Sequence, residues 1–445
     1  MLITVLGKGP KKDDRDYIPA KYYFHEEEKV YETSLFATAL SQYLQVDKIF
    51  MIGTVKSMWE EAYRYFSRAD GNPEKENIWL DLARKIGEQD EPSILVDDDL
   101  TVINQAIDEY LQTSHANASG GSICKLIQYG RNHEEIMENF KIFMDFQKEI
   151  QPGDEIYLDI THGFRSIPLF MYLMIDLIQT LRKEDSIQVS GIYYGMLDAI
   201  DPIHGYAPVV DLKPFFELTQ WTKGIYEFTN YGNVDLLVEL LDDVDMKETL
   251  KNISDLANLN FIKELRSQVD RLRGLLNKTQ TAQPIMFDHV KPKIVNFVEF
   301  FKGIDSDAKF QFRLAEWFYQ HGRYANCLIC LTESMVTQIA YIYIKSGEKI
   351  NYKFYTDRKT LEKELLEKVM LTDNDRDFQD AGKLFSYIKD IRNNAAHAGF
   401  LDNIDNQKII SEVGKNIKEI YHLYFSPEME KKLRLLPKKY PFDTL

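Results

Sequence analysis

Short apolar runs alternate with amphipathic stretches over the first half of the chain. The runs are continuous in Val, Ile and Leu, which is typical of strands buried on both faces of a parallel sheet. The candidate strands are Leu2–Leu6, Lys48–Ile52, Ser93–Val96, Ser122–Ile127, Glu155–Ile160 and Gln188–Tyr194. Helical periodicity separates them at Ser34–Leu44, Ser57–Ser67, Leu100–Leu111, Glu134–Glu149 and Pro168–Leu181.

Strands that alternate with helices predict an α/β, Rossmann-like domain with a parallel-sheet core over residues 1–215. Lys21–Phe24 and Lys29–Glu32 flank a short polar segment, which predicts a hairpin inserted at about residues 21–32. In such a domain the ligand lies at the carboxyl ends of the strands.

The pattern changes near Pro214, and from there Leu, Ile and Val recur at spacings of three and four. This periodicity predicts an all-α connecting region over residues 216–305 and an all-α domain over residues 306–445. The expected helices are Val234–Leu241, Phe261–Leu276, Phe312–His321, Tyr324–Ile344, Lys359–Val369, Ala381–Ala398 and Asn406–Tyr424.

Composition fits a folded chain of two or three domains, with 445 residues, 44% hydrophobic and 28% charged. The 54 Lys and Arg against 70 Asp and Glu give a net charge of −16, which disfavours a protein that coats DNA or RNA. Three cysteines make neither a disulfide framework nor a zinc site. We find no signal peptide and no apolar run near the ~20 residues that span a bilayer, so we expect a cytoplasmic protein without membrane contact.

Glycines stand where several predicted strands end. Gly7, Lys8 and Gly9 follow the first strand, Gly53 and Thr54 end the second, and Gly195 ends the last. Glycine lets a backbone approach a phosphate closely, and Lys8 adds a positive charge. A plain turn explains each of these segments equally well. The spacing fits neither a dinucleotide fingerprint nor a Walker motif, which excludes a dinucleotide-dependent dehydrogenase.

The segment from Asp159 to Pro168 joins an apolar strand to an apolar helix. It places Thr161, His162 and Arg165 at a helix N-terminus, where free N–H groups already favour anions, and Gly163 permits the tight turn. A capped turn with an incidental histidine is the alternative. Three phosphate-competent side chains within five residues favour a ligand site.

Arg392 and His397 lie five residues apart on the predicted C-terminal helix. At about 100° per residue they are roughly 140° apart, so they are not neighbours on one helix face. The helix buries a stripe of apolar residues at Leu384, Ile388, Ile391, Ala395 and Ala398. A histidine can move protons near neutrality and an arginine can hold a scissile phosphate, as RNA transesterification requires. A surface helix with a stray histidine is the default, but Asn393 and Asn394 disfavour helix and suggest another purpose.

Together these residues resemble the CRISPR-associated CARF–HEPN ribonucleases, accessory effectors of type III systems, over most of the chain. The resemblance rests on Gly7-Lys8-Gly9, on Gly53-Thr54-x-x-Ser57-x-Trp59, on Asp159-x-Thr161-His162-Gly163-x-Arg165, on Tyr194-Gly195 with Ala207–Leu212, and on Arg392-x4-His397. The strand-end motifs are similar to the CARF sensor domain, and the last motif is similar to the HEPN nuclease signature.

The resemblance implies a homodimer, with higher oligomers left open. Two CARF domains would bind one cyclic oligoadenylate, with cyclic tetra-adenylate favoured over the hexa-adenylate ring. Two HEPN domains would form a composite, metal-free site that cuts single-stranded RNA to 2′,3′-cyclic phosphate and 5′-hydroxyl ends. His397 would transfer protons, Arg392 would hold the phosphate, and Asn393 or Asn394 would position it.

The resemblance also implies that Thr161, His162, Gly163 and Arg165 bind the activator and that Gly7, Lys8, Gly9 and Thr54 line the rim. Whether His162 and Lys8 assist slow cleavage of the activator stays open. Two rivals remain: a nucleotide-binding sensor or adaptor with a catalytically inactive helical dimerisation domain, and a CARF-type transcription regulator. The regulator is disfavoured because the basic cluster at Lys431–Lys439 lacks a helix-turn-helix pattern, so we expect no DNA partner.

Overall fold

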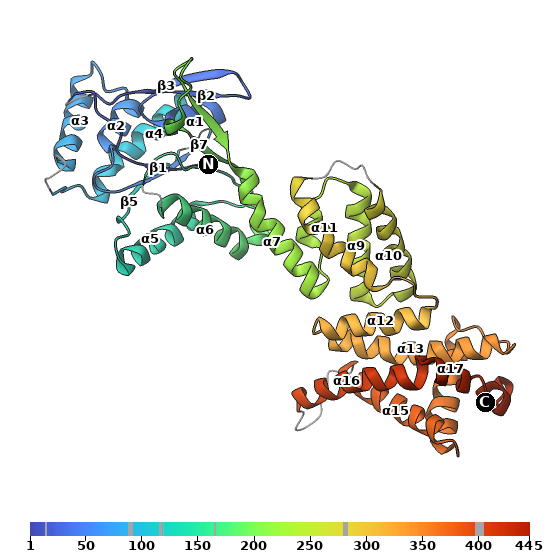
Figure 1. Cartoon of the computed structure of the whole chain (residues 1–445). Coiled ribbons are helices and arrows are strands. Elements are labelled where there is room, and N and C mark those ends of the chain that lie inside the picture. The colour runs from blue at the N-terminus through green and yellow to red at the C-terminus, as the bar shows by residue number, and fades with distance from the viewer. Residues whose placement is uncertain are drawn as a thin grey trace. The chain divides into compact units, whose positions relative to one another are not determined.

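A computed structural model describes residues 1–13, 16–87, 92–114, 118, 120–163, 166–278, 284–396 and 405–445. The chain divides into two compact units, Met1–Glu217 and Leu218–Leu445 (Figure 1). The first unit is α/β and the second is helical, as the change of pattern near Pro214 predicts.

A mixed sheet forms the centre of the first unit. Among the described residues it has eight strands in the order β3-β2-β8-β7-β6-β1-β4-β5. The strands are β1 (Leu2–Leu6), β2 (Ala20–Phe24), β3 (Lys29–Thr33), β4 (Ile49–Gly53), β5 (Ile123–Leu126), β6 (Glu155–Asp159), β7 (Gln188–Gly195) and β8 (Ala207–Asp211). The central strands are parallel, with β1 between β6 and β4, and every residue of β1 and β4 is buried.

The sheet is not parallel throughout, because β8 runs antiparallel to β7 and β2 runs antiparallel to β3. The predicted hairpin at residues 21–32 is confirmed as β2 and β3. It is part of the sheet, since β2 pairs in parallel with β8, a strand that the sequence pattern did not predict.

The predicted strand Ser93–Val96 is wrong. These residues form no strand, and Ile94 and Val96 are 70% and 55% exposed. The segment reaches the edge of the sheet through a side chain instead of its backbone: the Asp97 carboxylate accepts a hydrogen bond from the Leu126 N–H of β5 at 2.9 Å. An apolar, β-branched run therefore passes the edge without extending the sheet.

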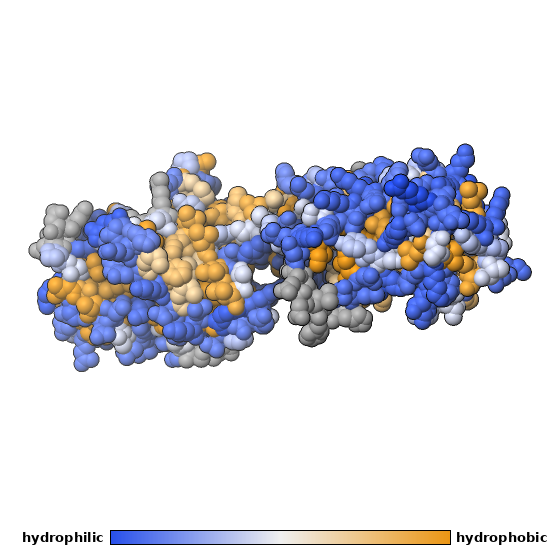
Figure 2. Space-filling view, turned by 90° about the horizontal axis from the view of Figure 1, so that it is seen from below, coloured by the Kyte–Doolittle hydropathy of each residue, from blue (hydrophilic) through white to orange (hydrophobic). Residues whose placement is uncertain are grey.

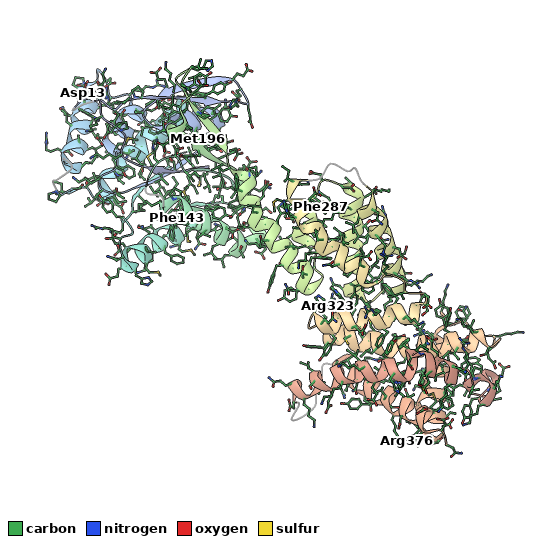
Figure 3. All side chains as sticks on the ribbon, in the orientation of Figure 1. Asp13, Phe143, Met196, Phe287, Arg323 and Arg376 are labelled. Carbon is green, nitrogen blue, oxygen red and sulfur yellow. The ribbon has the colours of Figure 1, made fainter. Side chains whose placement is uncertain are left out.

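Helices cover both faces of the sheet (Figure 1). Those that contribute to one hydrophobic cluster are α1 (Phe36–Leu44), α2 (Trp59–Ser67), α3 (Pro73–Ile86) and α4 (Thr101–Ser114). On the other face α5 (His133–Phe146) and α6 (Ser166–Leu181) form a second cluster, in which Phe143 of α5 is fully buried (Figure 3). Among these six helices, α3 is the one that the sequence pattern missed.

The second unit is helical over its described residues. Its helices are α8 (Asp235–Glu239), α9 (Val244–Leu259), α10 (Ile262–Asn277), α11 (Ile285–Phe300), α12 (Asp307–Gln320), α13 (Tyr324–Lys345), α14 (Tyr355–Thr360), α15 (Arg376–Ala396), α16 (Asn406–Ile420), α17 (Pro427–Leu433) and α18 (Leu436–Lys439). Helix α7 (Lys213–Tyr231) contains the boundary between the two units, and residues Leu361–Val369 and Tyr421–Phe425 are π-helical. One hydrophobic cluster runs from Trp221 to Leu436, so residues on both sides of position 305 share a core.

Helix α13 corrects the expectation that no apolar run approaches a membrane span. It has 22 residues and a mean hydropathy of 1.5 over its most apolar window, so by length and composition it could cross a bilayer. That window is 78% buried inside the protein, and Cys327 and Cys330 lie fully buried on it. The helix is the central helix of a packed core, and such a buried helix can be as long and as apolar as a membrane span.

Candidate functional site

A cavity of about 300 Å³ lies where β1, β4 and β6 end. It is lined by Leu6, Gly7, Lys8, Thr54, Lys56, Ser57, Tyr129, Gly163 and Ile167. Four of the residues predicted from the sequence thus come together: Gly7, Lys8, Thr54 and Gly163. They meet because the carboxyl ends of neighbouring parallel strands share one edge of a sheet.

Ser57 joins the loop after β1 to the loop after β4. Its hydroxyl donates to the Leu6 carbonyl at 2.6 Å and accepts from the Thr54 N–H at 3.0 Å. The Trp59 indole N–H donates to the Thr54 carbonyl at 2.9 Å. The helix predicted at Ser57–Ser67 begins at Trp59 instead, and Ser57 fixes the cavity wall.

Two glycines let the loops after β1 and β6 touch backbone to backbone. A Cβ on Gly7 would lie 2.9 Å from the Gly163 nitrogen. Gly163 has φ +95°, and a Cβ there would lie 2.4 Å from Cγ1 of Val5. Both positions therefore need glycine for close approach, and at Gly163 the backbone conformation requires it as well.

Asp159, which is buried, and His162, which is half-buried, form an acid–base pair beside the cavity. The Asp159 carboxylate is 0% exposed and accepts hydrogen bonds from the Thr4 hydroxyl at 2.6 Å and the Thr161 N–H at 2.8 Å. Burial raises the pKa of Asp159 and lowers the pKa of His162, and the Asp159 charge opposes the second shift. His162 is therefore neutral at pH 7, and its Nε2 is buried without a hydrogen-bond partner among the described residues.

The remaining predicted ligand residues of this unit do not line the cavity. Thr161 accepts a hydrogen bond from the Gly195 N–H at 2.9 Å, and a Cβ on Gly195 would meet the Tyr22 ring at 2.7 Å. Gly53 is packed under Ser57 and Trp59, and Gly9 lies against Met58 and Tyr17. Arg165 lies outside the described residues.

Five lining residues were not proposed as ligand residues from the sequence: Leu6, Lys56, Ser57, Tyr129 and Ile167. Tyr129 follows β5, so the rule that strand ends face the ligand could have found it. Lys56 is held by its ammonium group, which donates to the Ile86 carbonyl at 2.8 Å.

In the second unit, three of the predicted catalytic residues, Arg392, Asn393 and Asn394, fall on the last described turns of α15. The Arg392 side chain is 26% exposed, and its Nη2 lies 4.0 Å from a carboxylate oxygen of Glu362, in the π-helical segment. The Nζ atom of Lys389 lies 2.6 Å from the same Glu362 oxygen. The structure therefore pairs Arg392 with an acid, while His397 lies outside the described residues.

The predicted apolar stripe of α15 is shorter than expected. Leu384 and Ile388 are buried and Ile391 is half-buried, but Ala395 is exposed. Asn393 is half-buried and Asn394 is exposed. The last described turn of α15 therefore presents polar and small side chains outside the core.

No group of three or more His, Cys, Asp or Glu side chains that could hold a metal ion occurs in the described parts of the chain.

Family models match both units. Residues 1–198 match the CARF domain of the CRISPR system endoribonuclease Csx1, and residues 217–306 match the second domain of the CRISPR-associated protein MJ1674. The first unit therefore contains a CARF domain of the kind found in CRISPR-associated proteins.

One curated relative is the CRISPR-associated protein MJ1674 of Methanocaldococcus jannaschii, 40% identical over 349 residues. The alignment covers 77% of this chain and 54% of that protein, so the chain spans about half the length of the relative. Among solved structures, Enterococcus italicus Csm6 bound to cyclic hexa-2′-fluoro-hexa-dAMP aligns with 100% of this chain and 99% of that one, at a TM-score of 0.44 and 13% identity.

Proposed function

We propose that the protein is a metal-independent endoribonuclease of type III CRISPR antiviral defence that is activated by a cyclic oligoadenylate. The observation that carries the proposal is the strand-end cavity, because it lies in the segment that matches the CARF domain of an endoribonuclease. The protein acts in the cytoplasm on single-stranded RNA.

The cavity has the chemistry to bind the phosphates of the activator. Lys8 supplies a positive charge, and the backbone at Gly7 and Gly163 permits close approach. Thr161, His162 and Arg165 belong to the same loop after β6 and complete the site. A neutral His162 with a free Nε2 accepts a hydrogen bond from a ribose hydroxyl or an adenine amino group.

A second copy of the chain completes the sensor. Helix α6 begins directly after the loop that follows β6. It carries Leu169 and Leu173, which lie one turn apart and are 63% and 53% exposed. Figure 2 shows hydrophobic residues gathered on this face of the first unit. An apolar helix face beside a ligand loop supports a two-fold axis there, across which two cavities share one cyclic ligand.

The nuclease site is composite and lies at the end of α15. Arg392 from each chain holds the scissile phosphate and stabilises the charge that grows on it. His397 takes the proton from the RNA 2′-hydroxyl and returns a proton to the leaving 5′-oxygen, so a 2′,3′-cyclic phosphate and a 5′-hydroxyl form. Asn393 or Asn394 positions the phosphate.

The test is cleavage of a fluorescent single-stranded RNA in EDTA, alone and with cyclic tri-, tetra- or hexa-adenylate. We expect cleavage with one ring size, with the tetra-adenylate ring favoured, and none with His397→Ala. Tight binding of a ring without any cleavage would contradict the nuclease and favour a sensor or adaptor with an inactive helical domain. Loss of the ring during the incubation would reveal the additional ring nuclease activity.

A further inference from the structure

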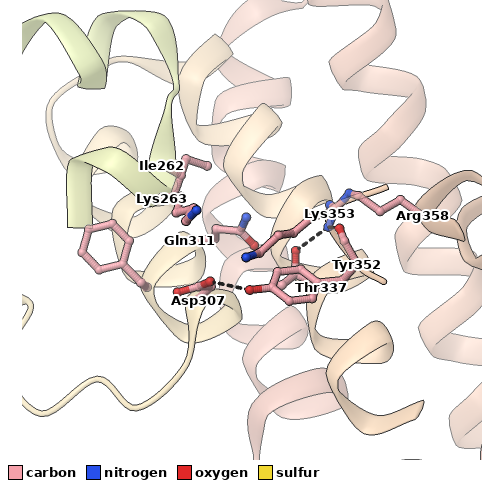
Figure 4. Close-up of a pocket in the computed structure, with 9 residues that line it drawn as sticks. Ile262, Lys263, Asp307, Gln311, Thr337, Tyr352, Lys353 and Arg358 are labelled. Carbon is pink, nitrogen blue, oxygen red and sulfur yellow. Dashed lines mark hydrogen bonds between the residues drawn. The ribbon is translucent and has the colours of Figure 1, made fainter. Parts of the chain in front are cut away.

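A cavity of about 180 Å³ lies inside the second unit, away from the end of α15. Its walls come from α10, α12, α13 and the turn before α14, and Figure 4 shows the side chains that converge on it. A neighbouring cavity of about 170 Å³ shares Asp307, Thr337 and Tyr352 with the first. The two cavities give a ligand room beyond a single small ion.

Most charges in the walls are already paired. Asp307 accepts a hydrogen bond from the Arg266 guanidinium at 2.6 Å and another from the Tyr352 hydroxyl at 3.1 Å. Arg358 forms an ion pair with Glu333 and donates to the Thr337 hydroxyl at 3.0 Å. These pairs hold the walls in place and neutralise the charges of Asp307 and Arg358.

Two of the lysines that line the cavity, Lys263 and Lys353, are exposed to solvent and are not paired with an acid among the described residues. Among the described residues, none forms an ion pair or hydrogen bond with the ammonium group of Lys263 or of Lys353. Lys353 stands on a fixed turn, since its N–H donates to the Asn351 side chain at 3.1 Å and the Asn351 N–H donates to Asp357 at 2.9 Å. Figure 4 shows both lysine side chains extending toward Gln311.

Gln311 adds an unfilled hydrogen-bonding group between these charges. Its Oε1 is buried and has no hydrogen-bond partner in the described chain. A buried acceptor without a donor costs free energy, and a ligand hydroxyl or amino group removes that cost.

We infer that this cavity binds a small phosphate monoester with a hydroxylated organic part, such as a sugar phosphate or a mononucleotide. A phosphate monoester carries about −1.5 to −2 charges at pH 7, which matches two unpaired ammonium groups. Its sugar hydroxyl donates to Gln311 Oε1 and occupies the space beside Tyr352. In a chain of net charge −16, two uncompensated cations in one cavity favour an anion over a neutral ligand.

The test is calorimetric titration of the full chain with ribose 5-phosphate, and separately with inorganic phosphate. We expect ribose 5-phosphate to bind, Lys263→Gln and Lys353→Gln to weaken it at least about tenfold each, and the double variant to abolish binding. Lys293→Gln, which removes an exposed lysine of α11 outside the cavity, leaves affinity unchanged. Gln311→Leu brings the affinity for ribose 5-phosphate down toward that for inorganic phosphate.

Lys8→Ala separates this site from the strand-end cavity, and we expect it to leave ribose 5-phosphate binding unchanged. Thermal unfolding of each variant checks that the fold is kept. The inference is wrong if ribose 5-phosphate produces no heat at 10-millimolar concentrations, or if it binds the double variant as well as the wild type. Weaker binding of single-stranded RNA by the double variant, without ribose 5-phosphate binding, would instead make these lysines contacts for an RNA backbone.

Discussion

The two candidate sites for activator and RNA differ in how the chain builds them. The strand-end cavity draws Gly7, Thr54 and Gly163 from three loops that one sheet edge brings together. In the predicted nuclease motif, Arg392 lies on α15 beside Glu362, and its spacing of five residues from His397 would correspond to about 140° on an ideal helix. In the proposed function, the sheet edge assembles a whole cavity within one chain before two copies share the ring, whereas the end of α15 supplies only half of the nuclease site.

The largest effect is expected at the proposed nuclease site at the end of α15. Arg392→Ala and His397→Ala should each lower RNA cleavage by about 10²–10⁴-fold, because each removes a group that acts on the reacting phosphate. Activator binding should not change, since the sensor lies in the other unit. Rates come from the fluorescent RNA assay, and affinities come from calorimetry with the cyclic oligoadenylate.

The matched control is Arg376→Ala, at the start of the same helix, whose side chain is 91% exposed (Figure 3). It should cleave RNA as the wild type does. Cleavage at the wild-type rate by the His397 variant would show that the catalytic assignment is wrong.

The next effect tests the close contact under the cavity. Gly163→Ala places a Cβ 2.4 Å from the Val5 side chain at φ +95°, so it should lower the unfolding temperature and weaken activator binding. Gly153→Ala is the control, because Gly153 has a similar φ of +81° with nothing within 4 Å of the added Cβ. Equal losses of stability in the two variants would mean that backbone strain alone, about 1–2 kcal/mol, explains the result.

A smaller effect is expected from the charge on the rim. Lys8→Ala should raise the activator concentration for half-maximal cleavage about tenfold, with the same maximal rate, because it removes one charged contact to phosphate. Lys141→Ala, on the exposed side of α5, should leave the concentration unchanged. His162→Ala and Arg165→Ala should shift the activator concentration in the same direction as Lys8→Ala. A lower maximal rate in Lys8→Ala would place Lys8 in catalysis instead.

The smallest effect concerns the pair formed by Asp159 and His162. The pKa of His162 is lowered in the folded chain from its ordinary 6.5, so the folded state favours the neutral ring. Its contribution to stability is present above pH 6.5 and is lost as the pH falls through the lowered value. Between pH 7.5 and 5.5, the urea midpoint of the wild type should therefore fall further than that of His162→Gln. Asp159 titrates in the opposite sense but is common to both proteins, and parallel pH profiles would exclude the assignment.

Buried strands were predictable where apolar runs are continuous, as in β1 and β4. The pattern failed at the margins of the sheet. Ile94 and Val96 have the side chains of a strand but stay exposed, because Asp97 bonds the edge of β5 in place of a backbone ladder. Strand β8 contains Pro208, which disfavours a strand, and its pairing with β2 joins residues far apart in the sequence.

Gly7, Lys8, Thr54 and Gly163 were predictable because each follows a strand, and the same rule applied to β5 would have added Tyr129. What the sequence did not reveal is which strand-end glycines face the cavity. Gly195 and Gly163 look alike in the sequence, yet the first makes room for the Tyr22 ring and the second for the Val5 side chain of β1. That difference depends on tertiary contacts that no local pattern encodes.

The pairing of β2 with β8 also determines when this unit can form during translation. Residues 22–24 need partners at 207–209, and β1 needs Tyr157–Asp159 on one side. At about 5–20 residues per second, the ribosome takes about 10–40 s to supply the missing strand after the hairpin emerges. During that interval β1, whose residues are all buried in the folded unit, and the open edge of β2 are exposed to chaperones and to neighbouring nascent chains.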